Sequence, residues 1–144
     1  MLIRNAHIDD IDQLISIEEY CYSIPWSRES FEEELTDNEL GIGLVAEDEG
    51  IVAGFALGIV VAGELQLHNI AVHPDHRGKG LARALMESVE EHCRANDLQR
   101  VFLEVRRDNE IANRLYQSLG FQSVGMRKDY YGPDQDANLY TKEL

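Results

Sequence analysis

The residues best suited to chemistry form a basic turn with two glycines, Arg77-Gly78-Lys79-Gly80-Leu81-Ala82. The segment 65–72 before this turn is largely apolar, and apolar residues recur every fourth position over 81–93 after it. A strand, a glycine-rich turn and a helix together present unpaired backbone N–H groups at the helix start, where a phosphate binds favourably. Arg83 adds a further positive charge. The turn therefore indicates a pyrophosphate site, although a flexible basic surface turn would have the same pattern.

The spacing around this turn disfavours other kinds of site. It lacks the third glycine of a dinucleotide-binding fingerprint and the Gly-Lys-Ser/Thr ending of a P-loop, so neither NAD nor a nucleoside triphosphate is the expected ligand. His73 and His76 lie in the same segment without a third ligand at zinc-site spacing. We therefore expect no metal.

Glu104 and Tyr116 are the candidates for acid–base chemistry. Glu104 is near the C-terminal end of an apolar strand, on the opposite side from its two apolar neighbours, and is placed to accept a proton from an amine. A salt bridge with Arg106 or Arg107 is the alternative role. Tyr116 borders the apolar face of a later helix, where its phenol could protonate a departing sulfur or simply be a half-buried core side chain.

Hydrophobic periodicity and turn residues predict alternating strands and helices. We expect strands at 2–6, 42–48, 51–61, 64–73, 99–106, 121–128 and 136–143, and helices at 8–20, 27–36, 78–95 and 109–119. This alternation implies an α/β sheet of mixed direction. The basic turn, the strand carboxylate and the helical tyrosine would then belong to one short α/β unit, which suits moving an acyl group.

Several short motifs resemble those of the GNAT acetyltransferase family, and the match covers nearly the whole chain. Arg77-x-x-Gly80-x-Ala82, after Ile70-Ala71-Val72, is similar to that family's coenzyme A signature, and Asn109…Tyr116…Leu119-Gly120-Phe121 is similar to its second hallmark. Three further segments resemble the RimI-type branch, which acetylates the N-terminal alanine of the eighteenth small-subunit ribosomal protein: Pro25-Trp26-Ser27, Leu103-Glu104-Val105-Arg106 and Arg127-Lys128-Asp129-Tyr130-Tyr131.

This resemblance implies a fold and a set of site residues. The GNAT fold is a mixed, mostly antiparallel sheet of six to seven strands, splayed between the fourth and fifth and flanked by four helices, with the thioester in the gap. Glu104 would be the base, Tyr116 the acid, and Trp26 and Tyr131 would rim the acceptor groove, unless they are ordinary loop anchors. Acetyl-CoA would contact Ile70, Ala71, Val72, Arg77, Gly78, Lys79, Gly80, Leu81, Ala82, Arg83 and Asn109.

Two of these assignments have specific structural requirements. Main-chain N–H groups of residues 70–72 would hold the oxyanion, where a strand bulge can free an amide. Asn109 precedes a predicted helix, so a simple helix cap explains it as well as a cofactor contact does.

Length and composition fit a single domain, residues 1–144, with 44% hydrophobic residues and only 3 prolines. The longest uncharged run, 51–63, is well short of the ~20 residues that span a bilayer, and the N-terminus has no apolar leader. Cys21 and Cys93 lie in unlike contexts and fit reduced thiols better than a disulfide. We expect a cytoplasmic protein without a membrane partner, a monomer or weak dimer.

The formal net charge of −14 is unevenly distributed. Residues 1–50 hold fourteen Asp and Glu against Arg4 and Arg28, whereas residues 51–144 hold thirteen acidic against eleven basic residues. An anionic cofactor would meet the second part and a cationic acceptor the first, and nucleic acid would be repelled. A surface that serves only solubility is the alternative.

The ionisation of amines favours a protein N-terminus as acceptor. An α-amino group has a reference pKa of ~7.7–8.0 against ~10.4 for lysine, so one modest base such as Glu104 suits the former. Together with the resemblance to the RimI-type branch, which implies a ribosomal protein, this makes a basic ribosomal-protein N-terminus the leading acceptor. A polyamine, a lysine or another small amine is the alternative, and a non-catalytic acyl-CoA-binding module is disfavoured because Glu104 and Tyr116 are both present.

Overall fold

The computed structural model describes residues 1–22, 25–36 and 41–144, and within them seven strands form one sheet. The strands are β1 (Leu2–Asn5), β2 (Ile42–Asp48), β3 (Ile51–Val61), β4 (Glu64–Val72), β5 (Arg100–Arg106), β6 (Gln122–Arg127) and β7 (Ala137–Glu143). The helices are α1 (Ile11–Cys21), α2 (Arg28–Thr36), α3 (Leu81–Ala95) and α4 (Glu110–Ser118), with short 3-10 turns η1 (Ile8–Asp10) and η2 (Pro74–His76). All predicted strands and helices are confirmed, with bounds that differ by three residues or fewer.

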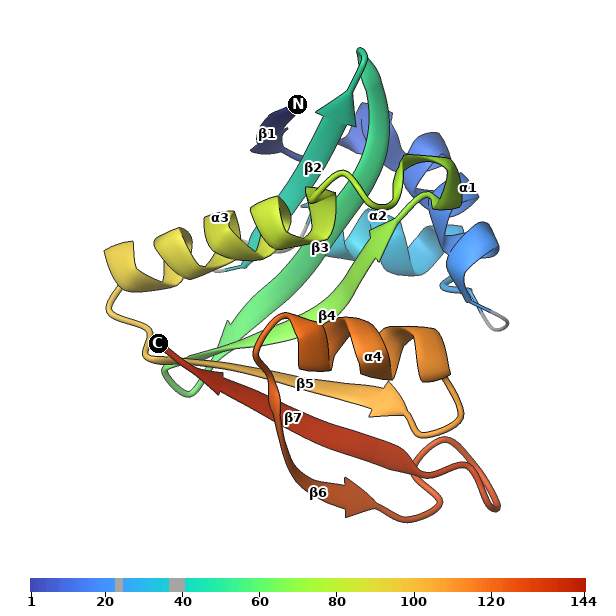
Figure 1. Ribbon diagram of the computed structural model, residues 1–144, viewed down its shortest axis with the longest axis vertical. Coiled ribbons are helices and arrows are strands. Elements are labelled where there is room, and N and C mark those ends of the chain that lie inside the picture. Colours follow the sequence, from blue (N-terminus) through green and yellow to red (C-terminus); the bar gives the residue numbers. More distant parts are fainter. Residues whose placement is uncertain (23–24, 37–40) are drawn as a thin grey trace.

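The sheet has the strand order β1-β2-β3-β4-β5-β7-β6 and is antiparallel except between β4 and β5. These two parallel strands pair at only two positions, Leu65 with Val101 and Gln66 with Phe102. Beyond Gln66 and Phe102 they separate, and α4 lies beside the opening in Figure 1. The predicted splay between the fourth and fifth strands is therefore confirmed, and we call this opening the fork.

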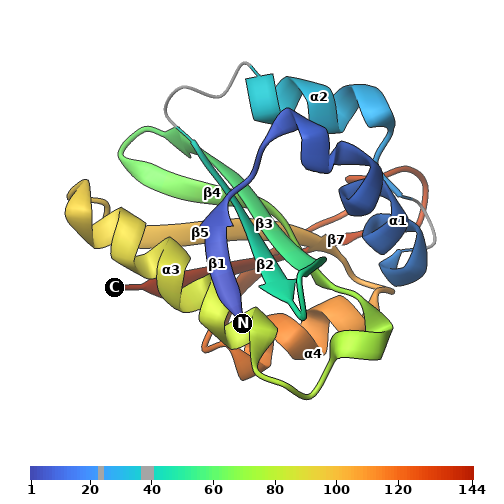
Figure 2. The ribbon, with the colours of Figure 1, turned by 90° about the horizontal axis from the view of Figure 1, so that it is seen from above.

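The helices cover both faces of the sheet, with α1 and α2 on one face and α3 and α4 on the other (Figure 2). One core cluster packs Phe31, Phe55 and Leu14 on the α1/α2 face. A larger cluster on the α3/α4 face includes Leu85 and Leu103. Each such fully buried side chain stabilises the fold by roughly 1.5–3 kcal/mol, so both faces are fixed against their helices.

A bulge in β4 controls which side chains enter the fork from that strand. Leu57 pairs with Asn69 and the next residue, Gly58, pairs with Leu67, so His68 is an extra residue in β4. A side chain at Gly58 would approach the Gln66 carbonyl oxygen to 2.7 Å, which explains the glycine. Because of the bulge, His68 and Asn69 both face α1 and α2 instead of alternating. We predicted a bulge within residues 70–72; it lies just before them.

Two helices begin three residues later than predicted. The segment 78–80 stays outside α3 because Gly78 and Gly80 have φ of +79° and +82°, a left-handed conformation that a helix does not contain. The predicted helix 8–20 is divided into η1 and α1, since His7 caps the first turn and the Asp10 carboxylate accepts the His7 backbone N–H at 2.7 Å.

Among the described residues, no helix is both long enough and apolar enough to span a membrane.

Candidate active site

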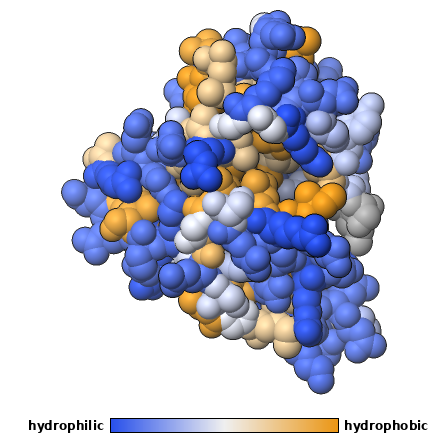
Figure 3. Space-filling view, viewed as in Figure 1, coloured by the Kyte–Doolittle hydropathy of each residue, from blue (hydrophilic) through white to orange (hydrophobic). Residues whose placement is uncertain are grey.

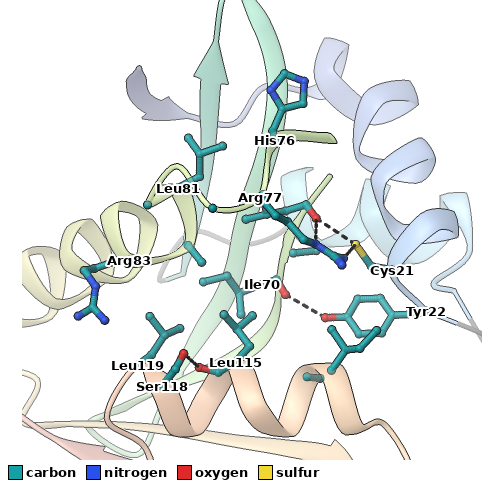
Figure 4. Close-up of a pocket in the computed structure, with 17 residues that line it drawn as sticks. Cys21, Tyr22, Ile70, His76, Arg77, Leu81, Arg83, Leu115, Ser118 and Leu119 are labelled. Carbon is teal, nitrogen blue, oxygen red and sulfur yellow. Dashed lines mark hydrogen bonds between the residues drawn. The ribbon is translucent and has the colours of Figure 1, made fainter. Parts of the chain in front are cut away.

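A cavity of about 330 Å³ lies between the glycine turn, β4 and α4, and we call it the turn cavity. Figure 3 shows hydrophobic surface in the hollow at the centre of this face, and Figure 4 shows the side chains. Nine of the eleven residues predicted to contact the cofactor line it: Ile70, Ala71, Val72, Arg77, Gly78, Gly80, Leu81, Ala82 and Arg83. Lys79 and Asn109 do not line this cavity.

Backbone geometry leaves room for a ligand at the start of α3. A β-carbon added at Gly78 or Gly80 would meet no atom within 4 Å, and α3 begins directly after Gly80 without a side-chain cap. The first N–H groups of this 15-residue helix therefore face the opening without a side-chain partner in the first turn. Such an end favours an anion through its unpaired donors and its dipole.

Lys79 is held away from the turn cavity by Asp48, at the end of β2. The Asp48 carboxylate accepts hydrogen bonds from Lys79 Nζ at 2.9 Å and pairs with His76 Nδ1 at 3.0 Å. These two partners, His76 foremost, lower the pKa of Asp48 to about 2. The contact ties the β2–β3 hairpin to the glycine turn, which sequence spacing does not reveal.

Arg77 is the basic residue that borders the turn cavity with fixed contacts. Its Nε donates to the Val72 carbonyl oxygen at 3.2 Å and its Nη2 contacts Cys21 Sγ at 3.3 Å (Figure 4). Burial raises the pKa of the Cys21 thiol, so the thiol stays neutral beside this guanidinium.

The opposite wall of the turn cavity comes from α4, which our site prediction omitted. Its apolar side presents Ile111, Ala112, Leu115 and Leu119 to the cavity. The spacing of these residues was visible in the sequence as a helix face, but it indicated only core packing. The cavity thus combines an apolar wall with a basic, glycine-containing end.

A second hollow, of about 210 Å³, opens on the α1/α2 side of the fork, and we call it the Glu104 cleft. It brings together five of the predicted site residues, which come from four separate parts of the chain. Its lining comprises Glu18, Tyr22, Trp26, His68, Asn69, Glu104, Val105, Arg106, Asn109, Tyr116 and Tyr131. The proposed base and acid therefore border the same cleft, with the proposed acceptor rim around them.

Glu104 projects into this cleft because β5 alternates strictly. Val101, Leu103 and Val105 are buried in the core cluster of the α3/α4 face, so Glu104 points to the other face. Its Oε1 lies 3.3 Å from Arg127 Nη1, on β6. The alternative partners that we considered bind elsewhere: Arg106 lies near Asp108 and Arg107 near Asp136, each at 3.6 Å.

Tyr116 lines the Glu104 cleft and is buried, with 5% of its surface exposed. Burial raises the pKa of its phenol above the usual value, and the hydroxyl of Tyr22 interacts with it. Tyr22 donates a hydrogen bond to the Ile70 carbonyl oxygen at 2.9 Å (Figure 4) and lines both hollows. We did not predict Tyr22, because a lone tyrosine after a helix carries no sequence signal.

A buried carboxylate forms the floor of the Glu104 cleft and was also missed. Glu18 on α1 is 2% exposed; its Oε2 accepts from Asn69 Nδ2 at 2.5 Å and its Oε1 from the Trp26 backbone N–H at 3.2 Å. Burial raises the pKa of this carboxyl. Because Glu18 binds both strand β4 and the segment carrying Trp26, it fixes the rim of the cleft relative to the sheet.

The remaining predicted residues have clear local roles. Asn109 caps α4, since its Oδ1 accepts from the Ala112 backbone N–H at 3.1 Å. The Trp26 ring packs on Phe31 with centroids 5.3 Å apart. The Arg106 guanidinium lies 4.9 Å from the ring centroid of Tyr131, whose pKa burial raises to about 12. Trp26 and Tyr131 are therefore ordered side chains at the edge of the cleft.

No group of three or more His, Cys, Asp or Glu side chains suited to a metal ion occurs in the described ranges. His73 and His76 have ring centroids 5.8 Å apart, with carboxylate partners Asp75 and Asp48 respectively.

Comparisons with known proteins agree with this architecture. Residues 11–121 match the model of the Acetyltransferase (GNAT) family. A relative from Bacillus subtilis (strain 168) is provisionally named a ribosomal protein bS18-alanine N-acetyltransferase. It is 39% identical over 129 residues, which are 90% of this chain and 85% of the relative. The ribosomal protein bS18-alanine N-acetyltransferase of Escherichia coli (strain K12) is 35% identical over 129 residues, 90% of this chain and 86% of its own.

A solved structure gives the same result. The crystal structure of the ribosomal-protein-S18-alanine N-acetyltransferase from Escherichia coli superposes with a TM-score of 0.86 at 32% identity, covering 99% of this chain and 93% of that chain. The chain belongs to the GNAT acetyltransferase family. It is an N-acetyltransferase with the GNAT fold, as the sequence motifs predicted.

Proposed function

We propose that this enzyme transfers the acetyl group of acetyl-CoA to the α-amino group of an N-terminal alanine, and that its acceptor is ribosomal protein bS18. The name of the Escherichia coli relative supports the acceptor. The observation that carries the proposal is the meeting of Glu104 and Tyr116 in one cleft at the fork, next to a cavity that fits a pyrophosphate carrier.

The turn cavity fits the donor at both of its ends. Its N–H groups at the start of α3, with Arg77 and Arg83, would hold the anionic pyrophosphate, which can approach closely because Gly78 and Gly80 lack side chains. The apolar wall of α4 would contact the uncharged arm that leads to the thioester. We leave Lys79 and Asn109 out of this set because both side chains already have other hydrogen-bond partners. Lys79 donates to the Asp48 carboxylate, and Asn109 accepts from the Ala112 backbone N–H.

Backbone groups of β4 suit the stabilisation of negative charge at the fork. The carbonyl oxygens of Ile70 and Val72 accept bonds from Tyr22 and Arg77, so these residues direct their backbone polar groups away from β3. In an antiparallel strand the N–H of a residue points to the same side as its carbonyl. Main-chain donors of this segment would therefore face the oxygen of a reacting thioester carbonyl.

The acid–base roles follow from position and burial. Acetyl-CoA supplies the acetyl thioester. Glu104 would accept a proton from the acceptor nitrogen, directly or through a water. Tyr116 would donate its phenolic proton to the departing sulfur, and its raised pKa keeps that proton in place at neutral pH. Tyr22 would support this step by its interaction with the Tyr116 hydroxyl.

The surface around the cleft suits a cationic acceptor. Residues 1–50, which supply α1 and α2 beside the cleft, carry fourteen acidic residues against two basic ones. Attraction of a basic peptide to this side would increase the rate of encounter more than the lifetime of the complex.

The test measures thiol release from acetyl-CoA with three amines. They are a basic peptide that starts with alanine, the same peptide blocked at its N-terminus, and spermidine. We expect turnover only with the free N-terminus, and mass spectrometry should place the acetyl group on the alanine. Turnover that blocking leaves unchanged would overturn the proposal, and turnover of spermidine alone would identify a small-amine enzyme. Tight coenzyme A binding without turnover of any amine would indicate a binding module.

A further inference from the structure

We propose that His68, oriented by Glu34, is a second proton acceptor in the Glu104 cleft and takes a proton from the α-ammonium group of the acceptor. This inference rests on the proposed function, because it concerns the same reaction. It assigns a catalytic role to His68, which lies outside all the sequence motifs described above.

The first support is the position of His68 across the fork from Glu104. The last β4–β5 pair joins Gln66 to Phe102, and His68 and Glu104 are each two residues further along their strands. Both side chains lie on the α1/α2 face, His68 through the β4 bulge and Glu104 through the alternation of β5. Together they line the Glu104 cleft and an adjoining hollow of about 260 Å³.

The second support is the orientation of the imidazole ring. Its Nδ1 lies 2.5 Å from Glu34 Oε1, and the Glu34 side chain is only 13% exposed, so α2 holds the ring firmly. Within residues 1–22, 25–36 and 41–144, Nε2 has no hydrogen-bond partner. With 31% of its side chain exposed, His68 can exchange a proton with water. The arrangement, a carboxylate on one ring nitrogen and an open second nitrogen, is that of a general base.

The third support is the proton balance of the reaction. An α-ammonium group has three N–H bonds and the product amide has one, so two protons leave the nitrogen. The first must leave before attack, because the nitrogen needs its lone pair, and we assign it to Nε2 of His68. The second leaves after the C–N bond forms and passes to Glu104. Tyr116 protonates the sulfur as the C–S bond breaks, the proton on Glu104 then replaces the one that Tyr116 has lost, and His68 returns its proton to water.

Charged and titratable groups surround the ring from every packed element. They include Glu18 on α1, Glu34 on α2, Glu104 and Arg106 on β5, Arg127 on β6 next to Glu104, and Tyr130 and Tyr131 between β6 and β7. The basic residues pair with other groups: Arg127 with Glu104 and Arg106 with Asp108.

The experiment measures kcat/KM for the alanine peptide from about pH 5.5 to pH 9.5 in His68→Gln and Glu34→Gln. We expect His68→Gln to lose about tenfold near pH 6.5 but less than about twofold near pH 9, where most α-amino groups are already neutral. Glu34→Gln keeps the imidazole but loses its orienting charge, and should give a smaller loss with the same pH dependence. The KM for acetyl-CoA should not change in either variant.

Matched controls are Glu33→Gln, an exposed neighbour of Glu34 on α2, and His92→Gln, on α3 away from the cleft. Both should keep the wild-type profile. An equal loss at every pH in His68→Gln, or no loss, would overturn the assignment and leave His68 a packing residue. If the wild-type enzyme turns over a different amine, the proposed function fails, and the same pH series with that amine decides the role of His68. If it turns over no amine, both proposals fail.

Discussion

The turn cavity and the Glu104 cleft lie side by side at the fork, but they are built in different ways. The turn cavity takes most of its lining from the continuous stretch 70–83 and one face of α4. The Glu104 cleft takes its lining from α1, the segment before α2, β4, β5, α4 and the β6–β7 connection. The first is apolar with a basic end, and the second contains the carboxylates Glu18 and Glu104 with aromatic rims.

This difference separates two tasks of an acetyltransferase. A site made of one strand, one turn and one helix start can bind the same pyrophosphate in any chain that keeps that short segment. The lining of a site made of six segments changes whenever the sequence of any one segment changes. Such a site is suited to selecting the acceptor. Tyr22 lines both hollows and is therefore the residue through which they meet.

The largest expected effect is in the Glu104 cleft. Glu104→Gln should reduce kcat by about 100-fold while the Kd for coenzyme A stays constant, because it removes a proton acceptor and leaves the turn cavity intact. The loss should be similar from about pH 6.5 to pH 9, because the proton that Glu104 accepts leaves the nitrogen only after the C–N bond has formed. Steady-state thiol release across pH measures it, with Glu143→Gln at the far end of β7 as control. A kcat within about twofold of the wild-type value would contradict the role of Glu104 as base.

The next effect concerns Tyr116, the proposed acid in the Glu104 cleft. Tyr116→Phe should lower kcat by about 10-fold or more with little change in coenzyme A binding, since only a proton donor is lost. Because burial raises its pKa, Tyr116 should cause no decline in wild-type rate below pH ~10. The control is Tyr140→Phe, a buried tyrosine that instead hydrogen-bonds Asn113 at 2.7 Å. A defect limited to cofactor binding would refute the acid assignment.

The third effect tests the turn cavity alone. Gly80→Ala places a side chain at φ +82°, which costs roughly 1–2 kcal/mol and shifts the start of α3. We expect about tenfold weaker coenzyme A binding by calorimetry, on the basis of that cost. Gly63→Ala is the matched control, since Gly63 has φ +81° in the β3–β4 hairpin and similar open space. If both variants bind coenzyme A equally well, the glycine turn is not the site that binds the pyrophosphate.

The smallest effect concerns the floor of the Glu104 cleft. Burial raises the pKa of Glu18 above its ordinary 4.5, so the folded state holds this proton more tightly than the unfolded state. Its contribution to stability is therefore complete below pH 4.5 and is lost as pH rises through the raised value. Glu18→Gln should flatten this part of the curve of unfolding free energy against pH in urea titrations. Glu19→Gln, at an exposed neighbouring position, should leave the curve unchanged. If the curve for Glu18→Gln ran parallel to the wild-type curve, the argument that burial raises the pKa of Glu18 would be contradicted.

The sequence was sufficient for the elements and for the turn cavity because both depend on short-range chemistry. Periodicity fixed the strands and helices to within three residues, and the two glycines marked the turn. The errors at the starts of α1 and α3 have local causes, a capping turn at His7 and left-handed glycines. Family motifs supplied the splay of the sheet, which periodicity alone does not encode.

The tertiary structure decided the Glu104 cleft. Its main contacts join residues that are more than twenty positions apart in the chain. Arg127 pairs with Glu104, Glu18 binds Asn69, and a bulge turns His68 toward Glu34. Such contacts have no periodic signal, because they arise only when the sheet register and both helix layers are in place. The sequence by itself thus determined the donor-side chemistry and the identity of the base and acid candidates, and packing determined their partners.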